Sequence, residues 1–76
     1  MKQQAPERAQ LERDVADVVG ANHAHQAGVW VAIGMVTARY DLEERAALTY
    51  LSRRATQREL LLHELAALLM SRQERP

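Results

Sequence analysis

The sequence has no cysteine and no phenylalanine, and only three glycines and two prolines occur among its 76 residues. The absence of cysteine excludes disulfides, thiol catalysis and cysteine-ligated metal sites, and it suits a reducing cytoplasm, where we expect the protein to reside. The N-terminal residues lack the apolar core of a signal peptide. The uncharged stretch at residues 21–38 has an apolar part too short to cross a bilayer, so no membrane association is expected.

Charge of neither sign dominates, because ten lysine and arginine residues balance ten aspartate and glutamate residues. A strongly basic chain would indicate a nucleic-acid partner, and this composition gives no such indication. The arginines are unevenly spread, and the one dense basic cluster consists of Arg53, Arg54 and Arg58. We therefore expect any contact with nucleic acid to centre on that cluster.

The sequence offers little catalytic or metal-binding chemistry. His63-Glu64 begins the zinc-protease pattern H-E-x-x-H, but Ala67 stands where the second histidine is required. His23 and His25 are two residues apart, which places them on different sides of a helix rather than at one metal ion. We expect no metal, no cofactor and no enzymatic activity.

Apolar residues recur at spacings of three and four from Leu11 to Val36, which predicts helix through most of the N-terminal half. Residues 1–6 are polar up to Pro6 and are expected to be a disordered tail. We predict one long helix from residue 7 to about residue 39, whose residues 7–28 can form a coiled coil. Gly20 and Gly28 each weaken a helix by roughly 1 kcal/mol relative to alanine. The alternative is a short first helix that ends near Gly20.

Two shorter helices are expected after the polar break at residues 39–41. Asp41 is a suitable N-cap for the first of them, which should end near Ala55. Thr56 and Glu59 form the pattern T-x-x-E of a capping box, so the next helix should run from about residue 57 to residue 71. Residues 73–76 are expected to be a second tail. No strand-like alternation occurs, and the predicted fold is all-α.

Small and apolar residues between residues 29 and 70 keep one register across three helical segments. They are Ala32, Gly34, Met35, Leu42, Ala47, Leu51, Ala55, Leu62, Leu65, Ala66 and Leu69. Arg39 ends the first segment, and the pair Arg53 and Arg54 ends the second. In order and spacing, these residues resemble the ANTAR domain, the small helical RNA-binding module of bacterial antitermination regulators of the AmiR and NasR type. The resemblance implies a three-helix head over residues 29–72 that binds RNA hairpin loops as a dimer and favours antitermination.

Four arginines and one tyrosine are the expected RNA contacts. Arginine binds phosphates bidentately and stacks on unpaired bases, and tyrosine stacks on them as well. The expected contacts are Arg39, Tyr40, Arg53, Arg54 and Arg58.

A homodimer is expected, because a domain this small is marginal on its own. The expected interface is the coiled-coil seam extended by one aromatic residue: Val15, Val18, Asn22, Val29 and Trp30. Asn22 would fix the register of the seam, and Trp30 would anchor the contact. Members of the ANTAR family commonly carry a sensor domain ahead of the RNA head, and this sequence shows none. We therefore expect either a sensor protein as partner or control through expression alone.

The departures from the family pattern support an alternative function. Trp30, Val31 and Ile33 are apolar where the family tends to have Glu, Gln and Lys, and Leu60 and Leu61 stand where Arg and Lys are common. An apolar excess of this kind needs another protein surface to cover it. The alternative is an ANTAR-like module for protein interaction or dimerisation that has lost RNA binding.

Overall fold

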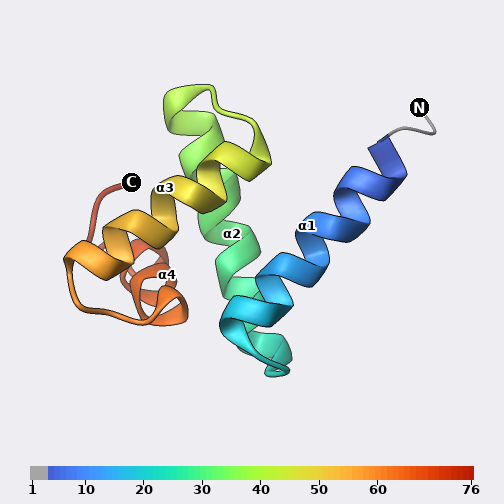
Figure 1. The fold of residues 1–76 in the computed structure, drawn as a ribbon. Helices are drawn as coiled ribbons and strands as arrows, with labels where there is room; N and C mark the ends of the chain where they lie inside the picture. Colours follow the sequence, from blue (N-terminus) through green and yellow to red (C-terminus); the bar gives the residue numbers. More distant parts are fainter. Residues whose placement is uncertain (1–3) are drawn as a thin grey trace.

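The structure, a computed structural model, describes residues 4–76. This part of the chain contains four helices (Figure 1). They are α1 (Gln4–Val19), α2 (His23–Tyr40), α3 (Glu44–Gln57) and α4 (Leu62–Met70). No strand occurs within residues 4–76, so the all-α prediction is confirmed. Residues 4–6 of the expected N-terminal tail belong to α1, and the first three residues of that tail lie outside the described part.

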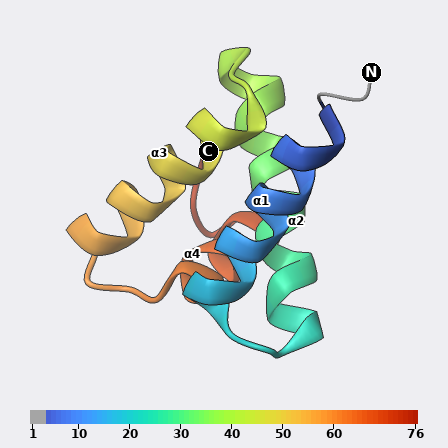
Figure 2. The same cartoon turned by 45° about the vertical axis from the view of Figure 1, so that its right-hand side comes forward.

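The prediction of one long helix, and with it a bundle of three helices, is wrong because the chain reverses between α1 and α2. Gly20 has a φ of 92°, a conformation that glycine adopts without the steric penalty of a side chain. Two residues later, the Asn22 side chain accepts a hydrogen bond from the His25 N–H at 3.0 Å and caps α2. A helix stop thus directly precedes a helix start, and the alternative of a first helix ending near Gly20 is confirmed. Figure 1 shows α1 and α2 running in opposite senses as two arms of a V that meet at the turn, and Figure 2 shows the same turn from another side.

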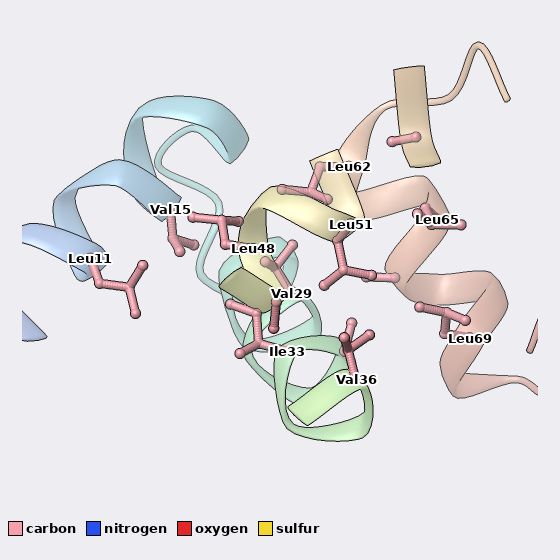
Figure 3. Packing of buried hydrophobic residues seen from close by; sticks show 14 residues of the cluster. Leu11, Val15, Val29, Ile33, Val36, Leu48, Leu51, Leu62, Leu65 and Leu69 are labelled. Atoms are coloured by element: carbon pink, nitrogen blue, oxygen red, sulfur yellow. The ribbon is translucent and has the colours of Figure 1, made fainter. Parts of the chain in front are cut away.

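Helix α2 packs against α1, α3 and α4 and forms the centre of the molecule. Its residues Val29, Ile33 and Val36 follow one another at helical spacing and are fully buried. Figure 3 shows how apolar side chains from all four helices gather around this row. The buried residues are Leu11, Val15, Val29, Ala32, Ile33, Val36, Ala47, Leu48, Leu51, Ala55, Leu62, Leu65, Ala66 and Leu69.

The predicted register of apolar residues corresponds closely to this core. Its positions in α3 and α4 are all buried, and so is Ala32 in α2. The exceptions are Gly34, which is exposed, and Met35 and Leu42, which are only partly buried at the edge of the core. The apolar pattern therefore gives the inward faces of the last two helices correctly.

The turn between α2 and α3 differs from the prediction at Asp41. This residue was expected to cap the start of α3, but it ends α2 with a φ of 56°. Its N–H donates to the Thr37 oxygen at 2.9 Å, which closes the last turn of α2. Aspartate tolerates the left-handed conformation better than most residues, so it can end a helix here. The N-cap of α3 is Glu43.

The start of α4 also lies further along the chain than predicted. Thr56 is inside α3, and Glu59 has a φ of 57°, which is incompatible with the interior of a right-handed helix. The expected capping box of these two residues therefore does not form. Instead the Glu64 carboxylate accepts a hydrogen bond from the Leu61 N–H at 2.8 Å, and α4 begins at Leu62.

Polar contacts fasten α1 to α2 and α3. Arg8 donates to the Glu44 carboxylate at 2.8 Å, and its guanidinium lies 4.4 Å from the centre of the Trp30 ring. A second ion pair joins Arg45 of α3 to Asp14 of α1. The hydrogen bond from Arg45 lowers the pKa of the Asp14 carboxyl. These contacts fix the outer side of α1 relative to α3.

The residues expected to hold a second copy of the chain mostly have partners within one chain. Val15 and Val29 are buried in the core, on two different helices. Asn22 caps α2, and Trp30 is half-buried beneath Arg8. Val18, at 59%, and Asn22 are the members of the set that stay exposed. A continuous seam along one helix does not exist, because the helix is broken at Gly20.

Leu65 and Leu61 give a direct test of the face of α4. Leu65 is fully buried, whereas Leu61 is 61% exposed. We expect Leu65→Ala to lower the free energy of unfolding by about 2–5 kcal/mol, because it removes buried methyl groups and leaves a cavity. Leu61→Ala should change it by less than about 0.5 kcal/mol, as exposed substitutions usually do. Urea unfolding followed by circular dichroism measures both, and equal losses would contradict the placement of α4.

Two glycine-to-alanine substitutions should act in opposite directions. Gly34 lies inside α2, and no atom beyond its own helix backbone lies within 4 Å of the place where an alanine methyl group would sit. Gly34→Ala should therefore stabilise the protein by about 1 kcal/mol through helix propensity. Gly20 has a φ of 92°, so Gly20→Ala should destabilise it by about 1–2 kcal/mol. Thermal unfolding of the two variants gives the comparison, and stabilisation by both would mean that α1 and α2 are one continuous helix.

Candidate nucleic-acid interface

Helix α3 has one face that packs into the core and one face that lines a groove at the surface. Ala47, Leu48, Leu51 and Ala55 point into the core. The residues that follow at spacings of three and four on the other side line a shallow groove. The groove is lined by Leu42, Ala46, Thr49, Tyr50, Arg53, Arg54, Gln57, Arg58 and Glu74. Three of the expected RNA-contacting arginines therefore line one groove, Arg53 and Arg54 from α3 and Arg58 from its C-cap.

Glu74, from the segment after α4, closes one end of the groove between two of these arginines. Its carboxylate accepts hydrogen bonds from both guanidinium groups, with Oε2 on Arg54 and Oε1 on Arg58. The Glu74 side chain is only 11% exposed, against 22% for Arg54 and 48% for Arg58. Two basic side chains one helical turn apart thus bind this carboxylate, which is almost completely shielded from solvent.

The main-chain oxygen of Pro76 accepts hydrogen bonds from the two tyrosines and from Arg54. The Tyr50 hydroxyl donates to this oxygen at 2.8 Å, the Tyr40 hydroxyl at 3.0 Å and Arg54 Nη1 at 2.6 Å. Arg54 Nη1 also lies 2.9 Å from the Tyr50 hydroxyl oxygen. The two tyrosine rings pack with their centres 5.4 Å apart and their planes tilted by 51°. One acceptor therefore joins the end of α2 to the outer face of α3.

The charges of this cluster shift the pKa values of its members. Hydrogen bonds from Arg58 and Arg54 hold the pKa of the Glu74 carboxyl below its ordinary value. Burial raises the pKa of Tyr50. The neighbouring Tyr50 hydroxyl lowers the pKa of Tyr40, and Arg39 contributes in the same direction. Glu74 is therefore ionised at neutral pH, as two charge-assisted hydrogen bonds require.

The five residues expected to contact RNA occupy neighbouring positions on this surface. Tyr40, Arg54 and Arg58 surround the segment that carries Glu74 and Pro76, and Arg53 lines the same groove. The Arg39 guanidinium lies 5.9 Å from the centre of the Tyr40 ring. Among the described residues, no ion pair involves Arg39 or Arg53. We call the set Arg39, Tyr40, Tyr50, Arg53, Arg54 and Arg58 the arginine–tyrosine surface.

The two residues that occupy this surface were not expected from the sequence. Residues 73–76 were predicted to be a tail, and instead Glu74 and Pro76 make the contacts just described. Their segment has neither apolar periodicity nor a recognised motif. The one signal present in the sequence is the pair Arg54 and Arg58 at spacing i, i+4, which offers a two-pronged site for an acid without saying which acid fills it.

The histidines do not add a metal site to this picture. His25 and His63 stack face to face with ring centres 3.7 Å apart and planes within 6°, which joins the first turns of α2 and α4. In the part of the chain that the structure describes, no three His, Cys, Asp or Glu side chains converge as metal ligands. Across the same residues, no helix has the length and apolar character needed to cross a membrane.

Comparisons with protein-family models, curated proteins and solved structures gave no match to this chain. The likeness to the ANTAR domain therefore rests on the residues quoted above. Function has to be inferred from the chemistry of the arginine–tyrosine surface itself.

Acid should release the segment that carries Glu74. The folded protein holds the pKa of Glu74 below its ordinary value of 4.5, so its contribution to stability is present above that pH and is lost as the pH falls through the lowered pKa. We expect the side-chain Nε–Hε NMR signals of Arg54 and Arg58 to shift below about pH 4.5. In Glu74→Gln these signals should stay constant over the same range. A transition centred near neutral pH, or an identical titration in Glu74→Gln, would contradict the assignment.

Proposed function

We propose that the protein is an RNA-binding regulator that recognises RNA hairpin loops through the arginine–tyrosine surface and thereby favours transcription antitermination. The observation that carries the proposal is the clustering of four arginines and two tyrosines at the end of α2 and along one face of α3. The resemblance of residues 29–72 to the ANTAR domain points to the same class of ligand.

The residue types on this surface suit an unpaired RNA loop. Guanidinium groups bind phosphate oxygens in pairs and stack on bases, and phenol rings stack on bases splayed out of a helix. Arg39 and Arg53 are exposed and have no ion pair among the described residues, so they are available for phosphates. Because the net charge of the whole chain is zero, the attraction for RNA has to come from this local concentration of arginines.

The proposed partners are an RNA hairpin, a second copy of the chain and, as a source of signal, a sensor protein. Two copies would place two arginine–tyrosine surfaces against two hairpins of one RNA, which raises affinity through effective concentration. The expected site of action is the cytoplasm, where the RNA is transcribed. No catalytic step is part of the proposal.

A protein-interaction module remains the second candidate, because several large apolar side chains are exposed. They are Val18 at 59%, Val31 at 50%, Leu61 at 61% and Met70 at 45%. Exposed apolar residues of this kind mark contacts with other proteins when they form a patch. In this alternative the apolar residues bind a protein partner and the arginines serve only solubility.

Arg53→Ala tests RNA binding without disturbing the fold, because Arg53 is exposed and lies outside the Glu74 contacts. We expect weaker binding to a labelled two-hairpin RNA. The slope of log K against log salt should also flatten by about 0.7 to 0.9, the loss of one phosphate contact. Arg13→Ala on α1 removes the same charge from an exposed helical position and is the control. Fluorescence anisotropy at several salt concentrations measures both.

The same titration separates the two candidate functions. If neither the wild-type protein nor any variant binds hairpin RNA at low salt, RNA binding is excluded. Sedimentation that then shows self-association, reduced by Val31→Glu or Leu61→Glu, would support the protein-interaction module instead.

A further inference from the structure

The Glu74 carboxylate presents its two oxygens to Arg54 and Arg58 in the manner of an anionic ligand. Each oxygen takes one guanidinium group, and the side chain is 11% exposed. Phosphate diesters likewise present two oxygens to arginines, and arginine is the residue best suited to bind both kinds of group. The Pro76 oxygen at the same time takes the hydroxyl hydrogens of Tyr40 and Tyr50.

We propose that Arg54 and Arg58 form a phosphate subsite for RNA and that the segment of residues 71–76 is a built-in competitor that fills this subsite until RNA displaces it. The inference rests on the proposed function and adds to it a position for one phosphate and a means of regulation. Bound RNA takes the place of the Glu74 carboxylate, and Tyr40 and Tyr50 lose Pro76 as their acceptor and become available to unpaired bases.

The attachment of the segment suits a competitor that can leave. None of its side chains belongs to the buried core. Its main chain is tied to the end of α4 by hydrogen bonds from the Gln73 N–H at 2.9 Å and the Glu74 N–H at 3.2 Å to the Leu68 oxygen. Beyond Glu74 the described hydrogen bonds of the segment are those that Pro76 accepts from the arginine–tyrosine surface. Release of the segment therefore removes no side chain from the core, and the contacts that hold it to the arginine–tyrosine surface are polar contacts.

A competitor of this kind reduces the apparent affinity for RNA. When only a fraction of molecules has an open subsite, the apparent dissociation constant equals the intrinsic one divided by that fraction. The gating requires no change in the four helices. Any partner or modification that draws Glu74 away would raise RNA affinity by the same route.

The test uses the full chain with Glu74→Gln, Glu74→Asp and the matched control Glu12→Gln. Glu12 is an exposed acid on α1 that pairs only with Arg8, at 3.4 Å, among the described residues. Glu74→Gln should tighten binding to the labelled two-hairpin RNA by about tenfold, the gain expected if about one molecule in ten is open in the wild type. Glu12→Gln should leave binding within about twofold, because it is far from the subsite and its charge is screened.

Glu74→Asp separates competition from simple repulsion. Aspartate keeps the negative charge but is one methylene shorter, so it cannot span Arg54 and Arg58 equally well. A competitor predicts tighter RNA binding by Glu74→Asp as well, whereas repulsion alone predicts no change. A second measurement needs no RNA: the Nε–Hε NMR signals of Arg54 and Arg58 in free Glu74→Gln should move from their wild-type positions toward solvent-exposed values.

Each outcome decides one of the two proposals. If the wild type and Glu74→Gln both fail to bind the hairpin RNA at low salt, the proposed function fails and the inference fails with it. If the wild type binds but Glu74→Gln binds equally or more weakly, or if only Gln and not Asp tightens binding, the competitor is overturned while RNA binding stands. Tighter binding by both variants, together with shifted arginine signals, is the result we expect.

Discussion

Burial of the apolar surface of α2 determines where the other three helices lie. This helix has one arginine near its C-terminus and no acidic residue, and its middle runs through Val29, Trp30, Val31, Ala32 and Ile33 without a charge. A helix that is apolar nearly all round is stable in water only when other elements surround it. Helices α1, α3 and α4 each cover one strip of it. At Gly28, the terminal methyl group of Met70 of α4 lies 3.2 Å from the place where a side chain would begin, so the Met70 side chain occupies space that glycine leaves free.

Apolar periodicity predicted the inward faces of the helices but could not reveal the reversal between α1 and α2. Val15 and Val29 lie on different helices and still face the same core, so the spacing of apolar residues continues across the turn as if no turn were present. Gly20 and Asn22 are the residues that indicate the reversal. Each of them alone is tolerable in a long helix, as a weak point or as a polar seam position. Only as a helix stop followed directly by an N-cap do they predict two helices.

The arginine–tyrosine surface was partly predictable for a similar reason. Once Leu51 and Ala55 are assigned to the core, helical spacing places Arg53 on the outer side of α3, while Arg54 and the C-cap residue Arg58 lie at the edge of the core face. The end of α2 brings Tyr40 beside Tyr50 and Arg54. The positions of Glu74 and Pro76 follow from no local rule. They depend on where α4 ends relative to α3 and on polar contacts that each contribute little. Repeated burial of apolar residues produces a periodic sequence pattern. A few hydrogen bonds at the surface produce no such pattern, so the positions of Glu74 and Pro76 could not be predicted.

The placement of the arginines suggests an order of events for the proposed RNA binding. Arg39 and Arg53 are exposed, whereas Arg54 is 22% exposed and shares its donors among Glu74, Tyr50 and Pro76. RNA phosphates approaching the surface would therefore meet Arg39 and Arg53 first. Contacts there raise the local concentration of phosphate beside Arg54 and Arg58, in the same way that linking two sites turns a second binding event into an intramolecular one. Glu74 then competes with a phosphate that is already nearby rather than with one in free solution. A modest competitor therefore sets a threshold for RNA binding without preventing it.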